Sequence, residues 1–275
     1  LVSSSAASDV YKRQVVGMRG DQSRLSPNLQ GRTDQAYTHL IEDERPWQIE
    51  LDRHVSFLQG LGFESPEIEP LVWTTPEDEQ FAEEFYETHE LNEVKVVALF
   101  GGAQAEHHRS QLLGEALRSS VDGTEYAVLA LGSSEDYVLN QRNCDSCGLR
   151  AINLSGKTSL RQAYALLRRC AFALGTETSL AHFACTLKIP HVVLLGGGHF
   201  GRFMPYSPFT TAVCLPLECY HCNWNCSCKD FYCLKDIDAT TVSAAIRDRL
   251  TRPGGDKSRV FVQQHSKSAA TDPSY

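Results

Sequence analysis

From Glu93 onward the chain alternates between short apolar runs and longer amphipathic segments, and this alternation restricts the folds that it can form. The apolar runs, rich in β-branched residues, lie at 94–100, 126–131, 150–154, 171–174, 191–195 and 211–215. Segments with helical patterns lie at 109–119, 159–169, 178–187 and 239–250. Strands separated by helices of about ten residues are typical of a parallel, doubly wound sheet. We therefore expect an α/β fold with a Rossmann-like domain over residues 93–250, and ligands at the carboxyl ends of its strands.

Residues 15–90 precede this alternation and contain few strand signals. One helix is predicted over 47–61, where apolar residues recur at helical spacing before Gly62. Another is predicted over 76–89, with Thr75 as its N-cap and acidic residues in its first turn. We interpret residues 15–90 as the remnant of an N-terminal domain together with a linker.

The two ends of the chain differ from the rest in composition. Residues 1–14 (LVSSSAASDVYKRQ) are rich in serine and alanine and show no periodicity. We expect them to be non-native, adapter-derived sequence, with a natural disordered terminus as the alternative. Because no methionine opens the chain, we also expect the true N-terminus to be missing. Residues 253–275 are polar, which predicts a disordered tail, and we expect residues 255–275 to pack against nothing.

Charge and hydropathy argue against a nucleic-acid-binding protein and against a membrane-spanning protein. A formal net charge of −8 and a pI near 5.7 argue against nucleic-acid binding, which needs a positive face. No apolar run reaches the roughly 18 residues of a membrane span, and no segment has the pattern of a signal peptide. We therefore expect a cytoplasmic protein. Among its ten cysteines, Cys144 and Cys147 form a separate, weaker C-x2-C pair, for which surface thiols are the alternative.

The strongest motif is GTETSLAH at 175–182, where a predicted strand meets a predicted helix. Thr176, Thr178 and Ser179 offer hydroxyl groups, and the N–H groups at the helix start suit a diphosphate. Glu177 is a candidate acceptor for ribose or sugar hydroxyls, and His182 can share one helix face with Thr178. The same residues also fit an ordinary capped helix, with Thr178 as the cap and a packed His182.

Two further turns follow predicted strands. In NLSGKTSL at 153–160, Gly156 permits a turn close to a ligand, Lys157 is a candidate phosphate contact, and Thr158 stands at the next helix start. The segment is not a P-loop, and a solvated Lys157 beside a cap is the alternative. After the first strand, Gly102 and Ala103 allow close approach of a ligand.

A cysteine cluster lies near the end of the predicted domain. Five thiols fall within fifteen positions, at Cys219, Cys222, Cys226, Cys228 and Cys233. In a cytoplasmic protein this spacing favours a metal over disulfides. Zinc would take four thiolates, and iron–sulfur ligation has similar demands. Reduced, partly buried thiols in an irregular loop are the alternative.

Together these motifs resemble glycosyltransferase family 9, the ADP-heptose:lipopolysaccharide heptosyltransferases. The resemblance covers about 94–250, with a fainter match in 37–62. It is carried by NLSGKTSL at 153–160, by GTETSLAHFACTLKIPHVVLLGG at 175–197, by Pro205-Tyr206, and by the cysteine segment before the last helix.

The resemblance implies a GT-B fold of two Rossmann-like domains. It also implies inverting transfer from a nucleotide-diphosphate sugar, usually ADP-heptose, to a lipid-linked glycan at the inner face of the cytoplasmic membrane. No cofactor is needed for that transfer. By the same resemblance, 176–179 and His182 would hold the donor, with His182 facing the leaving diphosphate.

Two departures from the family pattern concern the chemistry. Glu177-Thr178-Ser179 stands where the family often has Asp-Ser-Gly or Asp-Thr-Gly. The family's catalytic Asp lies in a Gly-rich loop near the start of the N-terminal domain, and Asp21 is not in that context. Since inversion needs a base, we expect a chain without it to be inactive. A GT-B sugar-nucleotide epimerase, or a non-catalytic sugar-nucleotide-binding or cysteine-cluster module, is the alternative function.

Overall fold

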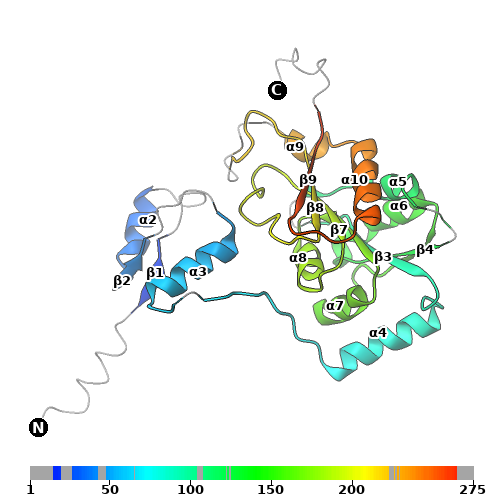
Figure 1. Ribbon diagram of the computed structural model, residues 1–275, viewed down its shortest axis with the longest axis horizontal. Helices are drawn as coiled ribbons and strands as arrows, with labels where there is room; N and C mark the ends of the chain where they lie inside the picture. Colours follow the sequence, from blue (N-terminus) through cyan, green and yellow to red (C-terminus); the bar gives the residue numbers. More distant parts are fainter. Residues whose placement is uncertain are drawn as a thin grey trace, which may run out of the picture.

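A computed structural model describes residues 15–19, 27–42, 48–64, 66–103, 108–121, 123, 125–222, 226, 228 and 230–264. In Figure 1 a small N-terminal group of elements is joined to a larger α/β domain through an extended stretch that ends at helix α4 (Pro76–Thr88). The expectation for residues 1–14 lies outside the described residues.

The N-terminal group contains β1 (Val16–Met18), α2 (Pro27–Asp34), β2 (His39–Ile41) and α3 (Glu50–Gly60). The two strands pair in parallel, a feature that the sequence did not predict. Helix α3 confirms the helix expected over 47–61, and Gly62 follows it with a left-handed φ of +91°. A glycine adopts that conformation at no steric cost, which explains why the helix ends there.

The larger domain is built on a seven-stranded sheet, as far as the structure describes the chain. Its strands are β3 (Lys95–Phe100), β4 (Tyr126–Ala130), β5 (Arg150–Asn153), β6 (Phe172–Thr176), β7 (His191–Leu194), β8 (Thr210–Cys214) and β9 (Arg259–Val262). They are ordered β5-β4-β3-β6-β7-β8-β9, and every neighbouring pair is parallel. This confirms the predicted doubly wound α/β domain.

Helices cover both faces of this sheet (Figure 1). Helices α4, α7 (Leu160–Arg168) and α8 (Ser179–Thr186) pack on one face. Helices α5 (Leu113–Arg118), α6 (Tyr137–Cys147) and α10 (Ala239–Thr251) pack on the other. Short turns η2 (Ser134–Asp136) and α9 (Tyr232–Lys235) lie in connections. Strand β3 serves both cores, because Val96, Ala98 and Phe100 face one and Val97 and Leu99 face the other.

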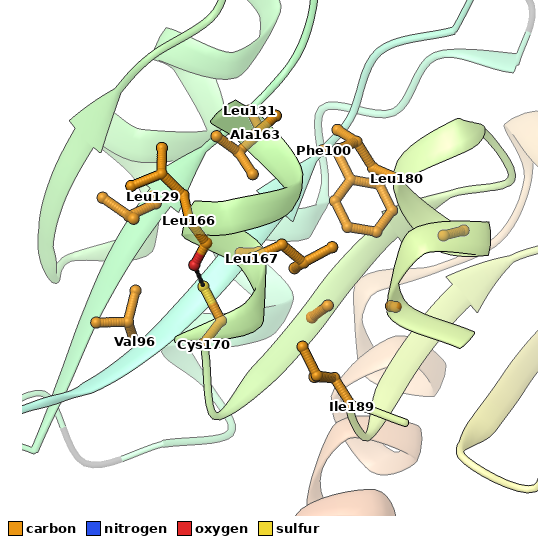
Figure 2. Close-up of a cluster of buried hydrophobic side chains, with 14 of the residues drawn as sticks. Val96, Phe100, Leu129, Leu131, Ala163, Leu166, Leu167, Cys170, Leu180 and Ile189 are labelled. Carbon is orange, nitrogen blue, oxygen red and sulfur yellow. Dashed lines mark hydrogen bonds between the residues drawn. The ribbon is translucent and has the colours of Figure 1, made fainter. Parts of the chain in front are cut away.

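Figure 2 shows the core beneath α7 and α8. Leu166 and Leu167 of α7 are fully buried in one cluster with Leu129 and Leu131, and Phe100 lies beside Leu180. Each such side chain contributes about 1.5–3 kcal/mol by leaving water. Phe100 and Leu131 stand at or just past the carboxyl ends of β3 and β4, so this core fixes the strand ends from which the next loops begin.

One expectation and one alternative are wrong. Residues 253–275 are expected to form a disordered tail, with 255–275 packed against nothing, but Arg259–Val262 form β9, which pairs with β8. Its alternately half-buried and exposed residues mark a strand at the sheet edge. Cys144 and Cys147 are not surface thiols, because α6 buries both sulfurs against the sheet.

Candidate functional site

The carboxyl ends of β3 and β6 form the switch point of the sheet, because the chain leaves β3 on one side and returns as β6 on the other. A cavity of ≈ 550 Å³ lies there. Phe100 and Leu131 line it from the core side. Its polar walls come from the three turns that the sequence singled out and from the loop after β4: Gly102, Ala103, Ser133, Glu135, Asp136, Thr158, Thr178 and Ser179. The predicted convergence of the turns at 101–103, 155–158 and 175–179 is thus confirmed.

Helix α8 begins beside this cavity without a side-chain cap. Its N-cap residue Thr178 is extended (φ −148°, ψ −179°), and its hydroxyl makes no capping hydrogen bond. Within the described residues, Thr178 Oγ1 is buried and has no hydrogen-bond partner. Helices α4 and α7 are capped by the hydroxyls of Thr75 and Ser159. The first N–H groups of α8 and its dipole therefore offer an anion site next to an unsatisfied hydroxyl.

Asp136 brings a buried carboxylate to the same cavity. Its Oδ2 accepts hydrogen bonds from the Ser133 amide at 2.9 Å and the Ser133 hydroxyl at 2.7 Å. Its Oδ1 is buried without a hydrogen-bond partner among the described residues, and Arg109 Nη2 lies 3.8 Å from it. Leaving a buried carboxylate oxygen unsatisfied is costly, so Asp136 Oδ1 indicates a ligand that carries a hydrogen-bond donor.

Sequence reasoning missed Asp136. The available signal was the Ser133–Asp136 spacing, which forms a capping box at η2. That spacing predicts the local bonds to Ser133, but it does not reveal that the second carboxylate oxygen faces the switch point.

Glu177 follows β6 and lies between two histidines. Its Oε1 is 2.9 Å from His182 Nε2, and its Oε2 contacts His199 Nδ1 closely. His182 Nδ1 is in turn 3.1 Å from the Tyr206 hydroxyl. Burial alone would raise the pKa of the Glu177 carboxyl, but hydrogen bonds from His182 and His199 outweigh it and lower the pKa from 4.5 to about 2. We call Glu177, His182, His199 and Tyr206 the Glu177 network.

Glu177 and His182 do not line the large cavity, and neither do three other predicted site residues, which have structural contacts instead. Thr176 donates its hydroxyl hydrogen to the Gly102 carbonyl at 2.6 Å and so ties β6 to the turn after β3. Gly156 has a φ of +75° and packs against Ser134, which leaves no room for a side chain. Lys157 Nζ lies 5.7 Å from the centre of the Tyr137 ring. Glu177 lines a second, smaller cavity together with His199, Cys222 and Cys233.

The cysteine segment brings three of its five sulfurs together. Cys219, Cys226 and Cys228 have sulfur atoms within 4.8 Å of one another, and Cys219 Sγ is 3.5 Å from Cys228 Sγ. Burial, followed by the neighbouring Cys228, raises the pKa of the Cys219 thiol to about 12. Cys222 and Cys233 do not belong to this trio and line the smaller cavity beside Glu177. The cysteine segment thus adjoins the Glu177 network.

Among the described residues, no helix has the length and apolar character needed to cross a bilayer.

Comparison with solved structures shows that the fold is that of GT-B-type heptosyltransferases. The chain is 18% identical to the ADP-heptose LPS heptosyltransferase II of E. coli, with a TM-score of 0.63 over 87% of this chain and 70% of that chain. A family 9 glycosyl transferase from Veillonella parvula gives a TM-score of 0.71 at 18% identity, over 86% of this chain and 67% of that one. The E. coli heptosyltransferase WaaC with ADP gives 0.51 at 14% identity, over 84% and 64%.

No curated protein matches the chain by sequence. The sequence pattern of glycosyltransferase family 9 (heptosyltransferase), in contrast, matches residues 1–231, which is most of the chain. With a doubly wound sheet, a polar cavity at its switch point and this match, the chain belongs to glycosyltransferase family 9.

Proposed function

We propose that the chain binds a nucleotide-diphosphate sugar of the ADP-heptose type and serves its inverting transfer to a lipid-linked glycan. The observation that carries the proposal is the meeting of three unsatisfied features in one cavity: the uncapped start of α8, Thr178 Oγ1 and Asp136 Oδ1. A diphosphate accepts hydrogen bonds, whereas ribose and sugar hydroxyls donate them, so one donor molecule satisfies all three. Family membership and the likeness to an E. coli heptosyltransferase with ADP support this assignment.

In this proposal the diphosphate lies at the start of α8, against the Thr178 and Ser179 hydroxyls. Gly102, Ala103 and Thr158 form the walls of the cavity. Asp136 accepts a hydrogen bond from a hydroxyl or amine group of the nucleotide sugar. His182, in the first turn of α8, stabilises the charge that develops on the leaving diphosphate. Lys157, Gly156 and Thr176 support the neighbouring turns, and Glu177 holds His182.

Inverting transfer also needs a group that takes the proton of the acceptor hydroxyl. We place this base on the acceptor side rather than in the donor cavity; Asp21 lies outside the described residues. We expect peripheral contact with the inner face of the cytoplasmic membrane when a lipid-linked acceptor is bound.

Calorimetric titration with ADP, UDP and GDP tests the donor site. We expect Thr178→Val to weaken nucleotide binding about 5- to 30-fold, as for one lost hydrogen bond of about 1–2 kcal/mol. The same substitution removes an unsatisfied buried hydroxyl, so thermal stability without ligand stays equal or rises. Weaker binding without lower stability distinguishes a ligand contact from a structural one.

Thr186→Val at the far end of α8 is the matched control, because Thr186 bonds to Tyr164 and Phe183 and does not line the donor cavity. It should leave nucleotide affinity unchanged. If a nucleotide binds wild type and Thr178→Val equally well, the cavity is not the donor site. Conversion of an ADP-sugar into an isomer of the same mass without any acceptor would favour the epimerase, whereas its hydrolysis to ADP and free sugar would favour the transferase.

We further propose a structural Zn²⁺ in the cysteine segment. Zn–S bonds of about 2.3 Å place tetrahedral sulfurs about 3.8 Å apart, and Cys219, Cys226 and Cys228 already lie within 4.8 Å of one another. Cys222 and Cys233 are the candidates for the fourth thiolate. Metal analysis of the reduced protein should give about one zinc per chain, lost in Cys226→Ser and kept in Cys144→Ser, where the thiol is buried in α6. Iron with visible absorption would identify an iron site instead, and a metal-free protein would contradict the proposal.

A further inference from the structure

The Glu177 network fixes which nitrogen of each histidine carries hydrogen. Glu177 is ionised at neutral pH, because its pKa is lowered to about 2, and an ionised carboxylate only accepts hydrogen bonds. The nitrogens that face it must therefore be N–H donors, namely His182 Nε2 and His199 Nδ1. When His182 is neutral, its Nδ1 is an acceptor, so the Tyr206 hydroxyl donates to it.

His182 is held at both ring nitrogens and against one ring by this arrangement. Both ring nitrogens have partners, and the ring stacks on Tyr206 with centroids 5.8 Å apart and an interplanar angle of 14°. The His182 ring thus has one orientation as long as the Glu177 carboxylate keeps its position. A residue that fixes the Glu177 carboxylate therefore also fixes the His182 ring.

His199 holds Glu177 from a separate segment. It belongs to the loop between β7 and β8, whereas Glu177 and His182 flank the start of α8. The His199 ring packs edge-on against His108, with centroids 4.9 Å apart, and near Phe203 at 5.4 Å. The loop that carries it is anchored again at Arg202, whose Nε donates to Glu50 Oε1 of α3 at 2.7 Å.

We infer that His199 is a positioning residue of the donor site: by binding one oxygen of Glu177 it orients the other toward His182, and so fixes the imidazole that faces the donor diphosphate. The inference rests on the proposed function for the role of His182. It concerns His199 itself, which touches Glu177 and not the large donor cavity.

Imidazole nitrogen spectra of the nucleotide-free wild type test the geometry directly. At a pH where both rings are neutral, long-range ¹H–¹⁵N correlation should show hydrogen on Nδ1 of His199 and on Nε2 of His182. Hydrogen on Nε2 of neutral His199 would overturn the inference, because a lone pair would then face the carboxylate. This readout needs no ligand, so it stands even if the proposed function fails.

Two substitutions separate positioning from packing. His199→Phe keeps the ring but removes the donor, whereas His199→Asn keeps an N–H donor in a smaller side chain. In His199→Phe we expect the His182 signals to report a mixture of tautomers and ADP affinity to fall about 5- to 30-fold, because His182 loses its fixed orientation toward the diphosphate. In His199→Asn both should return toward wild type.

His54→Phe, at an exposed position on α3, is the matched control and should change neither readout. If His199→Phe leaves the His182 signals and ADP affinity at their wild-type values, His199 does not position the site. If wild type binds none of ADP, UDP or GDP, the proposed function fails, while the tautomers still decide whether His199 orients His182 through Glu177.

Discussion

Gly102 packs closely against Asp136 at the donor cavity, and this makes Gly102→Ala a sharp perturbation. A Cβ on Gly102 would lie 2.5 Å from Asp136 Oδ2 and would overlap Cγ and Oδ1 as well. The backbone itself tolerates alanine, since Gly102 is not among the residues with positive φ. The carboxylate must therefore move and weaken its two bonds to Ser133. Bonds to a charged group are worth about 1.5–3 kcal/mol each, so partial loss of both costs about 2–4 kcal/mol of unfolding free energy.

A double-mutant cycle with Asp136→Ala isolates this effect. Urea unfolding followed by circular dichroism gives the free energy of unfolding of wild type, both single variants and the double variant. Asp136→Ala removes all three clashing atoms. In that background Gly102→Ala should be neutral or stabilising by up to about 1 kcal/mol, because it restricts only the unfolded chain. Coupling of at least about 2 kcal/mol is expected; additive costs in the double variant would refute the placement of Asp136.

Three other predictions concern single residues. Glu177→Gln should flatten the acid side of the plot of unfolding free energy against pH. The lowered pKa of Glu177 contributes stability that is complete above pH 4.5 and lost as the pH falls toward about 2. An unchanged dependence on pH, measured by urea unfolding across that range, would argue against the network. Burial lowers the pKa of His191 from 6.5 to about 4, so the unfolded chain binds more protons in that window and stability falls as the pH falls. His191→Gln should remove this pH-dependent fall in the free energy of unfolding, which amounts to as much as about 3 kcal/mol. If urea titrations of the variant still show the fall, the prediction is wrong. Arg249→Met should lower the free energy of unfolding by about 3–5 kcal/mol in the same assay. The buried guanidinium donates hydrogen bonds to Thr211 Oγ1 and to the carbonyls of Pro208, Thr210 and Pro253. A loss below about 1 kcal/mol would show that these acceptors find other partners.

The sequence predicts most of the central sheet because its strands are buried on both faces and appear as continuous apolar runs. Helix α6 shows where this signal fails. Its buried side includes Asn140 and Asn143, which bond to Gly101, Leu131 and Ser110 instead of packing as apolar residues. Hydrophobic periodicity does not register a helix whose buried face is made of amides.

Strand β9 escapes prediction for a different reason. At the sheet edge its four residues, Arg259–Val262, are alternately half-buried and exposed, and they follow a polar stretch. A pattern so short does not distinguish a strand from a tail.

The sequence likewise predicts only part of the candidate site. Local spacing predicts the turns that carry Gly102, Thr158 and Thr178, because parallel strands bring their carboxyl ends to one edge. The contact of His199 with Glu177 spans 22 positions, and that of Arg202 with Glu50 spans 152. Such contacts depend on the folded path of a loop, and no local pattern encodes them.

The link between α3 and the loop after β7 has a consequence for cooperativity. Glu50 donates its backbone N–H to the Arg202 carbonyl at 2.8 Å, and its carboxylate receives Arg202 Nε, so the start of α3 and the loop form a closed ring of two hydrogen bonds. The same loop reaches Glu177 through His199 and His182 through Tyr206. A molecule that displaces α3 must either break this ring or carry the loop with it. If such a molecule changes the affinity of the donor cavity for its ligand, thermodynamic linkage requires that the ligand change the affinity for that molecule by the same factor.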